Sequence, residues 1–123
     1  MTIKKAIARF DALYPNEIPY ERKLEWLSEL DGVVYDEIIA LHEDAPPTAF
    51  TGYILATPGS THLMVPFPYD KIYIEHLNAM LELIRGNAER YNNAAGLTAV
   101  TFDSFAAYYN RMHTPLQAAK INI

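Results

Sequence analysis

The histidines are the side chains best suited to hold a metal, but their spacing does not form a metal site. They are His42, His62, His76 and His113. None is followed four residues later by His, Asp or Glu, so the helical zinc motif H-E-x-x-H is missing. None follows a Glu by three residues, as in the Glu-x-x-His pairs of di-iron bundles. We therefore expect no metal and no other cofactor.

Catalytic motifs are also missing. Gly59-Ser60-Thr61 is similar to part of a phosphate loop, but it lacks the spaced glycines and the lysine that neutralise phosphate. It is more typical of a turn. Asp103 and Ser104 fit the capping of a helix start, and the other carboxylates do not single out a general acid–base pair. We predict that the chain has no catalytic residues and is not an enzyme.

Tyrosine is abundant, with nine residues against one tryptophan. Several of these rings could stack on nucleic-acid bases. Tyrosines more often lie at the edge of a helical core, with the ring buried and the hydroxyl in water, and we favour that interpretation. The tyrosines concerned are Tyr35, Tyr69, Tyr73, Tyr91, Tyr108 and Tyr109.

The composition is that of a single globular domain: 123 residues, half of them apolar and 20% charged. The absence of cysteine excludes disulfides, thiolate zinc sites and cysteine nucleophiles. A net charge of -5 argues against sequence-specific nucleic-acid binding, which usually needs a basic face. No apolar run approaches the ~20 residues of a membrane span. The first residues lack the apolar stretch and cleavage site of a secretory signal.

Apolar residues spaced by three or four predict helices along most of the chain. A first helix is expected from Ile3 to Tyr14, with Thr2 as its N-cap and Pro15 at its end. A long second helix is expected at about 21–43. Its inner stripe consists of Leu24, Leu27, Leu30, Val34, Ile38 and Leu41.

The same spacing continues without a change of phase from Tyr69 to Met112. One helix of this length would be unusual in so small a domain. We therefore predict two helices with a reversal between Gly86 and Thr101, most readily at Asn92-Asn93 or at 94–96. The expected fold is mainly α, a single domain of four to five helices over residues 1–113, followed by an extended tail at 114–123.

Residues 45–68 interrupt the helices with five prolines, two glycines and no Asp, Glu, Lys or Arg. Two short strands, about 50–56 and 61–65, are expected to form a β-hairpin around Pro58-Gly59-Ser60. Such an uncharged segment either projects as a protein-binding surface or folds back onto its own core. The sequence leaves both alternatives open.

Several short segments, which together extend over most of the chain from about residue 5 to 115, carry a family resemblance. Together they resemble the small head–tail connector (adaptor, head-completion) proteins encoded among the structural genes of tailed phages and prophages of Gram-positive bacteria. The segments are Ser28–Gly32, Phe50–Tyr53, Leu63–Pro66, Pro68–Asp70, Glu89–Asn93 and Tyr109–Arg111.

The resemblance implies a connector-like fold and a non-enzymatic structural role in the virion. Connectors form a homo-oligomeric ring beneath the portal, seal the packaged head and offer a surface to the tail; they can be monomeric in isolation. The implied partners are further copies of the chain, the portal protein and neighbouring head-completion or tail proteins. The implied location is the bacterial cytoplasm during assembly and then the virion neck. The candidate interface residues are Phe50, Tyr53, Leu55, His62, Met64, Phe67, Ile121 and Ile123.

Two other function classes remain open. One is a small helical ligand-binding or enzyme domain, with a pocket lined by Tyr73, His76 and Tyr109. The other is a regulatory interaction protein, which would need a basic recognition helix or a partner-binding tail. The acidic balance of the chain disfavours the regulatory class.

Overall fold

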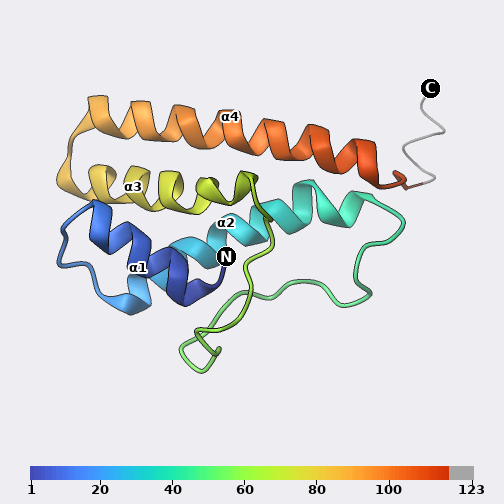
Figure 1. The fold of residues 1–123 in the computed structure, drawn as a ribbon, viewed down its shortest axis with the longest axis horizontal. Coiled ribbons are helices and arrows are strands. Elements are labelled where there is room, and N and C mark those ends of the chain that lie inside the picture. The colour runs from blue at the N-terminus through green and yellow to red at the C-terminus, as the bar shows by residue number, and fades with distance from the viewer. Residues whose placement is uncertain (117–123) are drawn as a thin grey trace.

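The computed structural model describes residues 1–116. In this part of the chain there are four α-helices and two short 3-10 turns, and no strand. Figure 1 shows α4 lying along α3, with α1 and α2 on the opposite side of α3. The helices are α1 (Ile3–Leu13), α2 (Tyr20–Glu37), α3 (Ile72–Arg85) and α4 (Ala88–Met112), and the 3-10 turns are η1 (Ile39–Leu41) and η2 (Tyr69–Lys71). The all-α class predicted from apolar spacing is confirmed.

The first helix matches its prediction because its start and its buried face were both encoded locally. The Thr2 hydroxyl caps it by accepting from the Lys5 amide at 3.2 Å. Ile3, Ile7 and Phe10 are buried in the common core. The free amides of its first turn are satisfied by the segment before α3, since Ile3 N–H donates to the Thr61 carbonyl at 3.0 Å.

The second helix is shorter than predicted, ending at Glu37 rather than near residue 43. A hydrogen bond explains the early end. The ring Nδ1 of His42 lies 2.7 Å from the Ile38 carbonyl, which in a continuous helix would accept from the residue 42 amide. The chain therefore tightens into η1, and the His42 amide bonds to Ile39 instead, at 3.3 Å.

The chain reverses at Gly86 and Asn87, inside the predicted interval but not at either favoured position. Gly86 ends α3 in the left-handed region, with φ 73°. The Asn87 side chain then caps α4 by accepting from the Arg90 amide at 3.1 Å. Asn92-Asn93 and residues 94–96 lie inside α4, so the expectation of a turn there is wrong.

The predicted β-hairpin is not formed, because its backbone groups find other partners. Leu63 N–H donates to the Met1 carbonyl at 2.9 Å, and Lys4 N–H donates to the Gly59 carbonyl at 3.0 Å. The segment thus pairs with the start of α1 rather than with itself, and only an isolated bridge between Thr2 and His62 has β geometry there.

The third helix forms the centre of the core and is buried on several sides. It packs against α1 and α2 on one side and along α4 on the other. Tyr73, Leu77 and Leu81 are almost inaccessible to solvent, and Phe105 of α4 joins the same cluster. None of the helices in residues 1–116 is long and apolar enough to cross a membrane.

Two glycines, Gly86 at the observed reversal and Gly96 at a position where a turn was predicted, allow a matched test. We expect Gly86→Ala to lower the free energy of unfolding by about 1–2 kcal/mol, because alanine is strained at a positive φ. Gly96→Ala should instead be neutral or raise it by up to about 1 kcal/mol, because Gly96 is inside α4 with nothing within 4 Å of an added Cβ. Urea unfolding followed by circular dichroism measures both. Equal effects of the two substitutions would contradict a reversal at Gly86.

Candidate protein interface

The uncharged segment 45–68 is fastened to the helices by one buried carboxylate. Asp31 lies on α2 and is completely inaccessible to solvent. Its Oδ1 accepts from the Tyr73 hydroxyl of α3 at 2.6 Å. Its Oδ2 accepts from the Tyr53 hydroxyl at 2.5 Å and from the Met64 amide at 3.1 Å. One side chain therefore joins α2, α3 and two separate points of the segment.

A hydrogen bond from Val65 fixes the direction of the hydrogen bond between Tyr73 and Asp31. Val65 N–H donates to the Tyr73 hydroxyl oxygen at 2.7 Å, so the tyrosine proton is directed to Asp31. Leu63 and Val65, on either side of Met64, are buried in the core. Around these residues the segment is folded back onto the core, which is one of the two alternatives that the sequence left open.

Burial dominates the electrostatics of this cluster. It raises the pKa of Asp31, while the hydrogen bonds from Tyr53, Tyr73 and Met64 act in the opposite direction. Burial and the neighbouring Asp31 charge raise the pKa of both phenols, so both stay protonated and able to donate. Since no solvent reaches Asp31, we assign the cluster a structural role rather than one in acid–base catalysis.

A close backbone approach holds a second point of the segment to α2. Tyr53 N–H donates to the Ser28 hydroxyl at 2.9 Å. Gly52 precedes it with φ 101°, and a Cβ on Gly52 would lie 2.7 Å from the Ser28 oxygen. Glycine is therefore required on both conformational and steric grounds. The segments Ser28–Gly32 and Phe50–Tyr53, which carried part of the family resemblance, are thus in direct contact.

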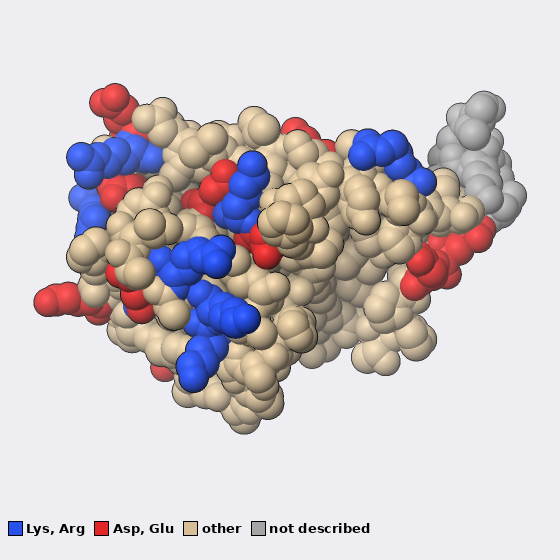
Figure 2. All heavy atoms as spheres, in the orientation of Figure 1, with Lys and Arg blue, Asp and Glu red and all other residues tan. Residues whose placement is uncertain are grey.

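The other side of the segment presents apolar residues to solvent. Ile54, Leu55 and Phe67 are 65%, 62% and 84% exposed. In Figure 2 the lowest part of the molecule, where the segment turns below the helices, is free of charged side chains. The segment thus combines a buried anchoring side with an exposed apolar side.

The candidate interface residues divide between these two sides. Leu55, His62 and Phe67 are exposed, while Phe50, Tyr53 and Met64 are half-buried. Tyr53 and Met64 serve the Asp31 cluster, and the Phe50 ring packs edge-on against Tyr53 at 4.9 Å. Ile121 and Ile123 lie outside the described residues.

Sequence reasoning missed Asp31 itself, although a signal was present. It lies four residues after Leu27 and three before Val34, so it shares their buried face of α2. An acid at such a position has to find hydrogen-bond donors inside the protein.

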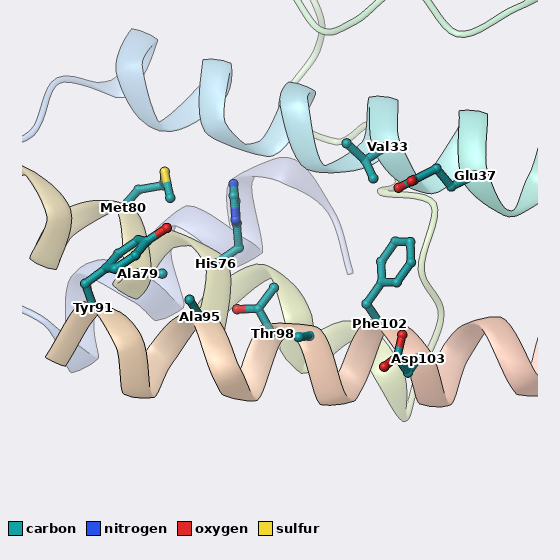
Figure 3. A pocket seen from close by; sticks show the side chains of 11 residues that line it. Val33, Glu37, His76, Ala79, Met80, Tyr91, Ala95, Thr98, Phe102 and Asp103 are labelled. Atoms are coloured by element: carbon teal, nitrogen blue, oxygen red, sulfur yellow. The ribbon is translucent and has the colours of Figure 1, made fainter. Parts of the chain in front are cut away.

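The alternative pocket of Tyr73, His76 and Tyr109 is not assembled. Tyr73 is committed to Asp31, and Tyr109 stacks on His113 with 3.7 Å between ring centroids. His76 alone of the three lines a groove of about 340 Å³ between α2 and α4 (Figure 3). Burial lowers the pKa of His76, and a hydrogen bond with the Trp26 backbone opposes this shift. Among residues 1–116, the His76 Nε2 has no hydrogen-bond partner.

The ends of α2 and α4 are joined by a second polar cluster. His42 Nε2 lies 2.8 Å from the Asn110 side-chain oxygen, and His113 Nδ1 lies 2.5 Å from Asp44. Thr114 accepts from the Glu43 amide at 2.8 Å. Within residues 1–116, no three histidine or acidic side chains gather closely enough to hold a metal ion.

Substituting Asp31 tests whether it organises the segment. We expect Asp31→Asn to lower the free energy of unfolding by at least about 2 kcal/mol, because the new amide would face buried donors. Residues 45–68 should also become more accessible to protease. Asp36→Asn, which changes an exposed acid on the same helix, should have little effect. Urea unfolding and limited proteolysis measure these changes, and two equally stable variants would contradict the assignment.

The raised pKa of Asp31 gives a pH dependence of known sign. The folded state holds the Asp31 proton more tightly than the unfolded state does, where the pKa is about 3.9. The raised pKa therefore adds to the free energy of unfolding below about pH 4. This contribution is lost as the pH rises through the pKa of Asp31 in the folded state. Urea titrations at several pH values should therefore find Asp31→Asn more destabilising at pH 4 than at pH 7. If the destabilisation caused by Asp31→Asn instead grew as the pH rose, the hydrogen bonds to Asp31 would outweigh the effect of burial on its pKa.

Comparison of the chain with protein-family models, with curated proteins and with solved structures finds no match.

Proposed function

We propose that the protein is a non-enzymatic virion structural protein, a head–tail connector that forms a ring beneath the portal of a tailed phage or prophage. The family resemblance of the sequence motifs motivates this assignment. The observation that carries it is the uncharged segment 45–68, which is fastened on one side and exposes apolar side chains on the other.

The chemistry of this segment suits a protein partner. The central part of a protein interface is depleted in charged residues and enriched in aromatic ones. Residues 45–68 contain no Asp, Glu, Lys or Arg, and Phe67 is their most exposed large apolar side chain. Ile54 and Leu55 add a second exposed apolar point. Such a surface gains more from contact with a partner than from contact with water.

The anchoring also suits assembly. A loop that is free in solution loses conformational entropy when it binds, which weakens the complex. Here Asp31, Ser28 and Tyr73 hold the segment by hydrogen bonds at residues 53, 64 and 65. Little further ordering is needed on binding. Ile121 and Ile123, which were also predicted to serve the interface, lie outside the described residues.

The test is assembly on the portal. The purified protein, mixed with portal rings from the same phage, should co-sediment with them and add a ring of density in electron micrographs. We expect Leu55→Asp and Phe67→Asp each to raise the Kd for the portal, measured by co-sedimentation, at least tenfold, equivalent to about 1.4 kcal/mol. Both side chains are exposed, so folding should be preserved.

Leu83→Asp provides the matched control. Leu83 is 54% exposed on α3, outside the 45–68 segment, and its substitution should leave binding to the portal unchanged. Failure of the unmodified protein to bind the portal would overturn the proposed function. If both Leu55→Asp and Phe67→Asp still bound the portal normally, the 45–68 segment would not be part of the interface.

A further inference from the structure

The solvent-facing side of α1 carries positive charge that no residue in 1–116 neutralises. Lys4, Lys5 and Arg9 are exposed there, around the small side chain of Ala8. None of these three bases forms an ion pair with a residue in 1–116. The one acid of the helix is already paired with a lysine of α2 at 2.7 Å. Figure 2 shows basic side chains gathered over the part of the molecule where α1 lies.

The exposed side of the second half of α2 carries the opposite charge. Glu29, Asp36 and Glu37 are exposed there, and Val33 between them is 44% exposed. Positions seven and eight residues apart lie on one side of a helix, so the three acids share a face. Within the described part of the chain, these acids form no ion pair either.

The two faces match in sign and in length. Lys4 and Arg9 are separated by about 8 Å along α1, and Glu29 and Glu37 by about 12 Å along α2, at 1.5 Å of rise per residue. The long lysine and arginine side chains can span the difference. At the middle of the basic face an alanine allows a second helix to approach closely. Complementary charges of this kind also orient two surfaces as they meet.

We propose that the basic face of α1 binds the acidic face of α2 on a second copy of the chain, with Ala8 opposite Val33. Duplex DNA fits the basic face less well, because three bases contact few phosphates and the chain's net charge of -5 repels it. The faces lie on different helices, so one copy can contact two neighbours head to tail, an arrangement that can close into a ring. In giving the proposed ring its contact between copies, the inference rests on the proposed function.

Disulfide exchange between two separately purified proteins tests the contact, because the chain contains no cysteine. Exposed ion pairs are individually weak, so a kinetic assay is more sensitive than isolation of a complex. Ala8→Cys is first converted to its mixed disulfide with thiopyridine, a neutral leaving group. It is then mixed with Val33→Cys or with the control Leu83→Cys, which is 54% exposed on α3 in the unmodified protein. Released thiopyridine gives the rate by absorbance.

We expect Val33→Cys to react severalfold faster than Leu83→Cys at low salt. Each rate is divided by the rate of the same thiol with free dithiodipyridine, which corrects for its intrinsic reactivity, and circular dichroism confirms folding. At about 1 M NaCl the two normalised rates should become equal, because charges are then screened beyond about 3 Å.

A charge exchange separates this contact from random encounter. Adding Lys5→Glu and Arg9→Glu to the Ala8→Cys protein should slow its reaction with Val33→Cys to the control rate. Adding Asp36→Lys and Glu37→Lys to the Val33→Cys partner should restore the faster rate, because the ion pairs re-form with opposite sign.

Equal normalised rates at low salt, or a failure of the exchanged pair to recover, would overturn the proposal. Equal rates together with charge-dependent binding of a labelled DNA duplex would assign the α1 face to nucleic acid instead. The assay contains no portal, so its failure leaves the portal-binding test of the proposed function unaffected.

Discussion

The interaction on which the arrangement of this protein depends is the set of hydrogen bonds to Asp31. A carboxylate without access to solvent is costly unless donors surround it. Two tyrosine hydroxyls and one backbone amide supply them, from α3 and from two points of the 45–68 segment. Removing one partner would leave the others buried and unsatisfied, so the geometry is specified more sharply than apolar packing alone would specify it.

This cluster explains how a segment with five prolines and no regular structure keeps a defined shape. Its backbone donors cannot be left unpaired where the chain is buried. The Val65 amide bonds to Tyr73, the Met64 amide to Asp31 and the Leu63 amide to the start of the chain. Three consecutive residues are thus held by three different parts of the fold. The apolar side chains at 54, 55 and 67 can be exposed because the anchoring does not depend on them.

The apolar spacing predicted the helices because burial of one face is a local, periodic signal. It did not predict where α2 and α3 end, since those positions depend on contacts distant in sequence or on single side chains. Ile38 ends α2 because His42 takes its carbonyl, and Gly86 rather than Asn92-Asn93 reverses the chain because it adopts a left-handed conformation. The hairpin prediction failed for a related reason. The turn at 58–61 is real, but the strands' backbone partners lie at residues 1–4 and on α2 and α3.

Two faces of α2 are used differently, and this difference follows from where its polar residues lie. Ser28 and Asp31 face the 45–68 segment and fix it from inside the core. Val33 and Glu37, on another face of the helix, line the groove beside α4 instead. The helix therefore separates an anchored, uncharged surface from an open groove. Because different residues of α2 serve each surface, a partner bound to the segment would leave the groove beside α4 open.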